Sequence, residues 1–284
     1  MEQPFEQVRS ILELSRNITV LTGAGISAES GVPTYRDKDG LWNSYRAEDF
    51  SSVTAWAKSP ATVWDWYQGR RAVMAAAEPN VAHKTLADLE ARTRGQVIVL
   101  TQNVDGLHQR AGSKIVVELH GNVWNIRCTN CGEERCEPDL GMGIPGCYSC
   151  HGMCRPAVTW FGESLNRTAW EHAVRATHCD TFVVIGTSAL VDPVAQLAPM
   201  AQKNHARIIE INTERTPISD IADFTLLGKA GEILPQLIPT EAQKEEFWIH
   251  ELDLGRAFER GLERFYSKYP DLRNKLSKSS TQEQ

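Results

Sequence analysis

Four cysteines near the middle of the chain have the spacing of a metal site. Cys128 and Cys131 form one C-x-x-C pair, and Cys147 and Cys150 form a second. Two such pairs supply four thiolates to a tetrahedral Zn²⁺ and leave no position for water, so we expect one structural zinc. Cys154 could replace Cys150, although the C-x-x-C pairing favours Cys150. A disulfide is the poorer interpretation, because the acidic, polar N-terminus does not resemble an export signal.

A glycine-rich segment follows an early apolar run. The chain passes from residues 18–21 through Thr22 into Gly23-Ala24-Gly25-Ile26-Ser27-Ala28. In this G-x-G-x-x-A pattern, backbone amides can approach the pyrophosphate of a dinucleotide. A tight turn between a strand and a helix would explain the same residues without a ligand. No second strand ending in an acidic residue follows at the usual distance, which disfavours a hydride-transfer dehydrogenase.

Polar side chains also follow two later apolar runs. The run 97–100 is followed by Gln102, Asn103 and Asp105, and His120 ends the run 115–119. Amides and carboxylates can bind a ribose or a carboxamide, and histidine ionises near neutral pH, as a catalytic base requires. An Asx turn would explain Asn103 and Asp105, and a structural role would explain His120, so the residue types alone leave both interpretations open.

The elements that must position these groups alternate between short strands and helices. Strands are expected at residues 18–21, 97–100, 115–119, 181–185, 207–211 and 224–227. Helices are expected at residues 4–15, 82–92, 167–176 and 194–203. Continuous apolar strands that alternate with helices predict a Rossmann-like, doubly wound α/β fold with a parallel sheet. Ligands of such sheets bind at the carboxyl ends of the strands.

Two insertions and an extension interrupt the alternation. We expect a catalytic domain over residues 1–240, with its core in 1–37, 81–127 and 155–240. A Trp- and Tyr-rich helical insert at 38–80 and a zinc-ribbon module at 128–154 should form a smaller lobe. Residues 241–284 are charged with spaced apolar side chains, which predicts a helical extension and a polar tail.

The order of these motifs resembles that of the sirtuin family. The segment from Gly23 to Asp37 is similar to the first sirtuin signature, and the segment from Thr101 to His108 is similar to the second. Further blocks follow in the family's order at residues 120–121, 160–163, 186–188 and 212–214. The resemblance runs from about Leu12 to Ile238. It implies a NAD-dependent protein-lysine deacylase, in which the acyl oxygen attacks the nicotinamide ribose and nicotinamide, free lysine and O-acyl-ADP-ribose are released.

The resemblance also implies roles for individual residues. His120 matches the catalytic base. The implied NAD-binding residues are Gly23, Ala24, Gly25, Ser27, Ala28, Glu29, Tyr35, Arg36, Trp42, Gln102, Asn103, Asp105, Gly186, Thr187, Ser188, Asn212, Glu214 and Ala230. Phe161, Gly162 and Val191 match the strips that pair with the substrate peptide as an added strand. Tyr35 stands where the family usually has Phe.

A Tyr-x-x-Arg pair lies in the helical insert. Tyr67 and Arg70 are three residues apart, so they share one face of a helix. Sirtuins that act on acidic acyl groups carry such a pair, and Arg and Tyr can bind the carboxylate of a succinyl or malonyl lysine. Alternatively, Tyr67 packs within the lobe and Arg70 lies on a solvated face of the helix. We favour carboxylate binding, with acetyl-lysine as a slower or parallel substrate.

Charge and hydropathy disfavour two further classes of protein. Lys and Arg number 30 and Asp and Glu 36, and the net charge of −6 is unlike that of a nucleic-acid-binding protein. No apolar run approaches the ~20 residues that span a membrane. We therefore expect a cytoplasmic enzyme whose partners are acylated lysine side chains of proteins. ADP-ribosyl transfer, NAD hydrolysis and a non-catalytic NAD- and zinc-binding module remain alternatives, and the sequence does not indicate the oligomeric state.

Overall fold

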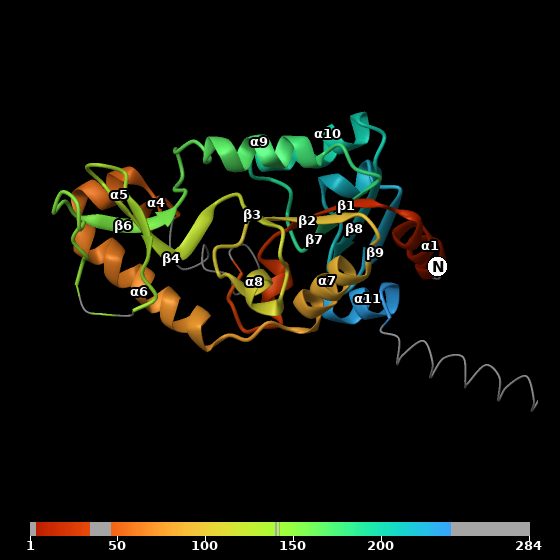
Figure 1. Ribbon diagram of the computed structural model, residues 1–284, viewed down its shortest axis with the longest axis horizontal. Coiled ribbons are helices and arrows are strands. Elements are labelled where there is room, and N and C mark those ends of the chain that lie inside the picture. Colours follow the sequence, from red (N-terminus) through yellow and green to blue (C-terminus); the bar gives the residue numbers. More distant parts are fainter. Residues whose placement is uncertain (1–3, 35–46, 140, 142, 240–284) are drawn as a thin grey trace, which may run out of the picture. The chain divides into compact units, whose positions relative to one another are not determined.

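The computed structural model describes residues 4–34, 47–139, 141 and 143–239 (Figure 1). Its larger part is a six-stranded sheet with the order β3-β2-β1-β7-β8-β9, in which every neighbouring pair is parallel. The strands are β1 (Asn17–Thr22), β2 (Gln96–Thr101), β3 (Val116–Glu118), β7 (Thr181–Ile185), β8 (Arg207–Asn212) and β9 (Phe224–Leu227). Each predicted strand is found with its ends shifted by at most one residue, so the doubly wound α/β fold is confirmed.

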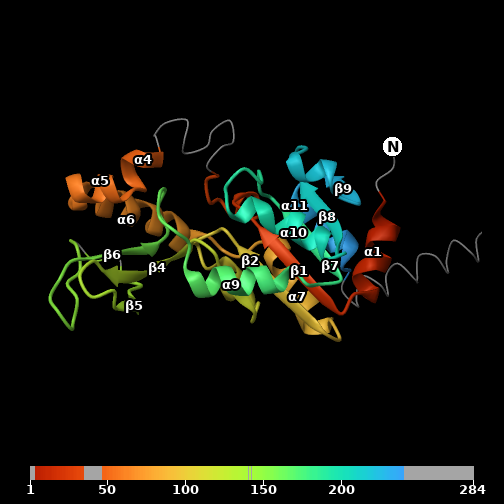
Figure 2. The ribbon, with the colours of Figure 1, turned by 90° about the horizontal axis from the view of Figure 1, so that it is seen from above.

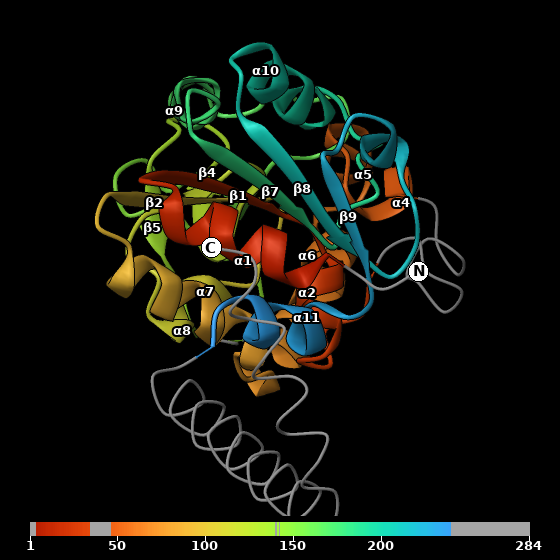
Figure 3. The same ribbon diagram turned by 90° about the vertical axis from the view of Figure 1, so that its right-hand side faces the viewer.

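Helices cover both faces of this sheet (Figure 3). One face carries α9 (Arg167–Ala176), the short η1 (Val194–Gln196) and α10 (Leu197–Lys203). The other face carries α1 (Phe5–Leu14), α7 (Val81–Arg92) and α11 (Ala230–Leu237). All five residues of β7 are buried. This two-sided burial explains why the strands read as continuous apolar runs.

The apolar core has a layer on each face of the sheet. On one face, Val8 of α1 and Leu234 of α11 pack with Val20 of β1. On the other face, Ala173 of α9 and Leu197 of α10 pack with Phe182 of β7. The sheet is therefore held rigidly from both sides, and its carboxyl-terminal edge is a fixed platform for a site.

A three-stranded antiparallel sheet with the order β5-β4-β6 forms a smaller lobe. Its strands are β4 (Gly121–Cys128), β5 (Glu134–Cys136) and β6 (Cys154–Val158). Helices α4 (Ala47–Phe50), α5 (Val53–Lys58) and α6 (Pro60–Ala76) lie beside it, and α6 contacts β4 and β6 (Figures 1 and 2). The sequence placed residues 121–127 and 155–158 in the core, but they belong to this small sheet. Only every second or third residue of β4 is buried, so the strand does not read as a continuous apolar run.

Short elements complete the described part of the chain. They are α2 (Gly25–Ala28), α8 (Leu107–Ala111) and η2 (Pro217–Asp220). Within this part of the chain, no helix has both the length and the apolar character needed to cross a membrane. The predicted extension over residues 241–284 lies outside the described residues.

Candidate active site and metal site

A cleft of about 590 Å³ lies at the carboxyl ends of the core strands and is closed on one side by the smaller lobe. In the strand order, the chain proceeds from β1 outward to β2 and β3 on one side and to β7, β8 and β9 on the other. The cleft therefore opens at the topological switch point, where doubly wound sheets bind ligands. The predicted site residues that line it are Gly23, Ala24, Gly25, Ala28, Glu29, Tyr67, Arg70, Gln102, Asn103, His120, Phe161, Gly162, Gly186, Thr187, Ser188, Val191, Asn212, Glu214 and Ala230. Tyr35, Arg36 and Trp42 lie outside the described residues.

The glycines of the first loop are needed for close packing against the loop after β7. A Cβ atom on Gly23 would lie 2.6 Å from Thr187 Cβ, and one on Gly25 would lie 2.7 Å from Gly186 Cα. The two loops are joined by a hydrogen bond from Gly25 N–H to Gly186 O at 2.8 Å. Gly186 itself has a φ of +59°, which disfavours any side chain. These glycines bring two strand ends together at the floor of the cleft.

A buried polar network lies behind the cleft wall. Asn103 Nδ2 donates to Gly23 O at 3.0 Å and to Ser27 Oγ at 3.1 Å, and Ser27 Oγ donates to Asp105 Oδ2 at 2.8 Å. Asp105 also accepts the Leu107 N–H, as in the Asx turn weighed from the sequence. Burial raises the pKa of Asp105, partly offset by these hydrogen bonds. Ser27 and Asp105 are absent from the cleft lining, so they orient Asn103 from behind.

His120 is held in one tautomer by the backbone. Its Nδ1 lies 3.0 Å from Gln102 O, and because a carbonyl only accepts, Nδ1 carries the proton. Burial lowers the pKa of His120, although the bond to Gln102 opposes the shift. Nε2 of the neutral ring is then the basic nitrogen. This is the state that a general base requires near neutral pH.

The polar side chains at the strand ends hold one another in place. Gln102 Nε2 donates to Thr187 Oγ1 at 2.8 Å, and Asn212 Nδ2 donates to Thr187 O at 2.9 Å. At the start of α11, Glu29 Oε2 accepts the Gly231 N–H at 2.8 Å. That carboxylate therefore also caps the start of α11. Side chains from β2, β7 and β8 thus form one connected rim.

Tyr67 and Arg70 project from α6 into the same cleft as His120. They are 5% and 9% exposed, so Tyr67 packs within the lobe, as the alternative interpretation expected, whereas Arg70 does not lie on a solvent-exposed helix face. The Tyr67 hydroxyl accepts the Trp160 Nε1–H at 2.9 Å, and the Arg70 guanidinium lies 5.2 Å from the centre of the Trp66 ring. Both groups are therefore fixed by aromatic neighbours.

The predicted peptide-binding strip borders this pocket. Phe161 N–H donates to Ser51 O at 2.9 Å, and Gly162 has a φ of +86° that favours glycine. The next residue, Glu163, forms two hydrogen bonds with Arg155 of β6, at 2.6 and 2.8 Å. The strip is thereby anchored to the small sheet.

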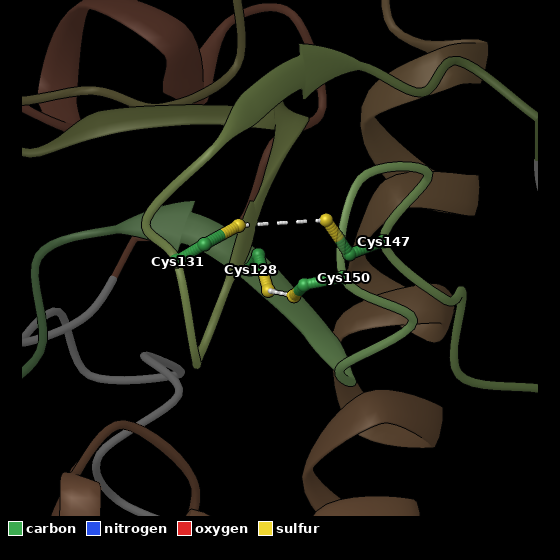
Figure 4. A group of neighbouring side chains, drawn as sticks. All are labelled: Cys128, Cys131, Cys147 and Cys150. Carbon is green, nitrogen blue, oxygen red and sulfur yellow. Dashed lines mark hydrogen bonds between the residues drawn. The ribbon is translucent and has the colours of Figure 1, made fainter.

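The four predicted zinc ligands point toward one another (Figure 4). Their sulfur atoms all lie within 4.8 Å of one another, with 3.4 Å between Cys128 and Cys150 and 3.6 Å between Cys131 and Cys147. A tetrahedral site with Zn–S bonds of ~2.3 Å has sulfur separations of about 3.8 Å, so the donor set fits zinc. Cys154 is not in the group, which resolves the ambiguity with Cys150 in favour of Cys150.

The cleft also contains residues to which the sequence assigned no site role. They include Ser51, Trp66, Thr159, Trp160 and Asp192. Trp160 could have been found from its position in the 160–163 block, but a single serine in the helical insert gives no signal. Ser51 becomes notable only because the fold brings it to Tyr67.

Comparisons with known proteins agree with this geometry. Residues 23–193 match the Sir2 family. The chain is 47% identical over 235 residues to NAD-dependent protein deacylase 2 of Pyrobaculum aerophilum, covering 81% of this chain and 93% of that protein. It is 49% identical over 218 residues to the NAD-dependent protein deacylase of Aquifex aeolicus, covering 76% and 91%.

Solved structures agree as well. A Sir2 homolog–NAD complex superposes with a TM-score of 0.78 at 42% identity, covering 82% of this chain and 92% of that one. A Sir2–p53 peptide–NAD⁺ complex gives a TM-score of 0.75 at 32% identity, covering 84% and 97%. The co-substrate of this chain is NAD, and its four-cysteine cluster fits a structural zinc. This chain belongs to the sirtuin family and is a NAD-dependent protein deacylase.

Proposed function

We propose that this sirtuin removes acidic acyl groups, succinyl and malonyl, from protein lysines, with acetyl-lysine as a slower or parallel substrate. The observation that carries the proposal is the position of Tyr67 and Arg70, which line the same cleft as His120 while almost fully buried. A guanidinium can donate two parallel hydrogen bonds to a carboxylate, and a phenol can donate a third. An acetyl group offers no acceptor at that end of the pocket, so it gains nothing from these groups.

His120 is the proposed catalytic base. With Nδ1 bonded to Gln102 O, it accepts a proton at Nε2 from a hydroxyl group in the cleft. The carbonyl of Gln102 then stabilises the positive charge that develops on the ring. When bound, NAD supplies the ribose–nicotinamide bond whose cleavage drives removal of the acyl group.

The cofactor-binding roles extend this proposal to the rest of the cleft. Gly23 to Ala28 would hold the pyrophosphate through backbone amides, and Asn103 would hold the ribose next to nicotinamide. Thr187, Asn212 and Ala230 would hold the adenosine half. Cys128, Cys131, Cys147 and Cys150 would hold one zinc that keeps the small sheet folded. A cytoplasmic location, which would keep these thiols reduced, belongs to the same proposal.

Substitution of Arg70 tests the acyl preference. We expect Arg70→Met to lower kcat/KM for a succinyl-lysine peptide by about 10- to 100-fold, because a charge-assisted hydrogen bond contributes about 1.5–3 kcal/mol. Turnover of the matching acetyl peptide should change much less. Arg167→Met is the matched control, since the Arg167 side chain is 92% exposed on α9. Equal losses on both peptides would contradict the proposed preference.

A further inference from the structure

Ser51 lies at the polar end of the acyl pocket. It precedes α5, is 8% exposed and lines the cleft together with Tyr67 and Arg70. Its Oγ is 3.1 Å from the Tyr67 hydroxyl. Its carbonyl accepts the Phe161 N–H, and Ser52 forms a parallel bridge with Phe161. The backbone of Ser51 is thus fixed by the peptide-binding strip, independently of the hydroxyl.

The hydrogen-bond directions at Tyr67 give the Ser51 hydroxyl a specific role. The indole Nε1–H of Trp160 can only donate, so the Tyr67 oxygen accepts from it at 2.9 Å and the Tyr67 proton points elsewhere. Tyr67 and Ser51 together carry two hydroxyl protons, and their mutual bond uses one. When a ligand supplies strong acceptors, both protons can turn toward it.

We propose that Ser51 is a third acyl-recognition residue, whose hydroxyl acts with Tyr67 and Arg70 to select acyl groups that end in a carboxylate. A carboxylate is acceptor-only and has about four lone-pair sites, which match two guanidinium N–H groups and two hydroxyls. The methyl group of acetyl-lysine accepts from none of them. A buried site built to donate hydrogen bonds discriminates strongly against an analogue that lacks the acceptor. This inference rests on the proposed preference for acidic acyl groups.

The test compares the ratio of kcat/KM on succinyl and acetyl peptides in wild-type protein and in Ser51→Ala. The truncation keeps the backbone bond to Phe161 and removes only the hydroxyl. We expect the succinyl-to-acetyl ratio to fall about tenfold, chiefly through a higher KM for the succinyl peptide, since a hydrogen bond to a charged group is lost.

Ser52→Ala is the matched control in the same segment. Ser52 Oγ caps α5 by accepting the Ala55 N–H at 3.1 Å, and Ser52 is not among the lining residues. Its loss should alter both peptides by the same factor and lower the melting temperature. A Ser51→Ala ratio within twofold of wild type, or a loss equal on both peptides, would overturn the inference.

Arg70→Met in the same assay separates the two proposals. If Arg70→Met loses succinyl turnover selectively and Ser51→Ala does not, only the role of Ser51 is wrong. If neither variant shifts the ratio, the acidic-acyl preference is wrong and the role of Ser51 falls with it.

Discussion

Neutralising Glu163 should loosen the proposed peptide-binding strip and destabilise the protein. Glu163 accepts from Arg155 at 2.6 and 2.8 Å and from the Trp160 N–H at 2.8 Å. The Arg155 guanidinium carbon lies 3.4 Å from the centre of the Trp160 ring. The guanidinium also donates a hydrogen bond from Nη2 to Val158 O. The side chains of Arg155 and Glu163 are 9% and 22% exposed. The pair therefore joins β6 to the strip that begins at Phe161.

The cost of Glu163→Gln follows from this burial. Removing one partner of a buried ion pair costs about 3–5 kcal/mol, and the partial exposure of Glu163 reduces this to about 2–3 kcal/mol. For a domain of this size the melting temperature should fall by roughly 4–12 °C. The KM for an acyl peptide should rise, because the strip is no longer fixed before the peptide binds.

The pH dependence gives a second check on the same pair. Burial alone would raise the pKa of Glu163, but hydrogen bonds from Arg155 and the Trp160 N–H outweigh it and lower the pKa. A lowered folded-state pKa stabilises the protein above the unfolded value of about 4.3, and this stability is lost as pH falls through the folded value. The difference between wild type and Glu163→Gln should therefore be full at pH 7 and shrink below about pH 4.

The assay is thermal unfolding of both proteins at several pH values, with peptide KM measured at pH 7. Glu171→Gln is the control, because Arg167 and Glu171 form a similar pair with side chains 92% and 50% exposed. If Glu163→Gln melts at the same temperature as Glu171→Gln and binds peptide normally, the pair does not hold the strip.

Three further predictions concern the base, the glycine loops and the zinc ligands. His120→Ala should lower kcat by about 10²- to 10⁴-fold while calorimetry still detects NAD binding. Because burial lowers the pKa of His120, wild-type activity should persist as pH falls to about 6.5 and drop only at lower pH. A loss of activity centred above pH 6.5 would exclude protonation of His120 as its cause. Gly25→Ala should destabilise the protein by about 1–3 kcal/mol in urea unfolding and weaken NAD binding, because the new Cβ would lie 2.7 Å from Gly186 Cα. An unchanged urea midpoint would show that the loops of Gly25 and Gly186 can move apart without cost. Purified protein should contain about one zinc per chain by elemental analysis, and Cys147→Ser should lose the metal and the fold of the small sheet; a folded, active, zinc-free preparation would refute the structural role.

The sequence predicts the large sheet well because its strands are buried on both faces. Strand β7 is buried throughout, four of its five residues are apolar, and its predicted bounds are those observed. Strand β4 was missed because it is buried on one face only, and α11 was missed because it is short and contains Pro235. Strand β6 is buried throughout but was also missed, because it contains Arg155 and Pro156 and is not an apolar run. Local patterns therefore identify elements that are both buried and apolar along their length.

The site was predictable where residues are neighbours along the chain. The two C-x-x-C pairs are identified by their spacing, whereas the polar residues directly after the strands are assigned site roles through the resemblance to sirtuins. The resemblance assigns Ser27 and Asp105 to NAD, and the structure places both behind Asn103, where their position depends on how β1 and β2 pair. Ser51 and Trp160 both form hydrogen bonds with Tyr67, and the three residues lie in separate segments of the chain. No pattern in a single sequence contains these contacts.

The most direct measurement is turnover of succinyl, malonyl and acetyl peptides of one sequence by wild-type protein, with NAD present and all products identified by mass. We predict that nicotinamide, free lysine and the O-acyl-ADP-ribose form in equal amounts, with higher kcat/KM for the two acidic acyl groups. Faster turnover of the acetyl peptide, or nicotinamide release without free lysine, would contradict this account of the cleft.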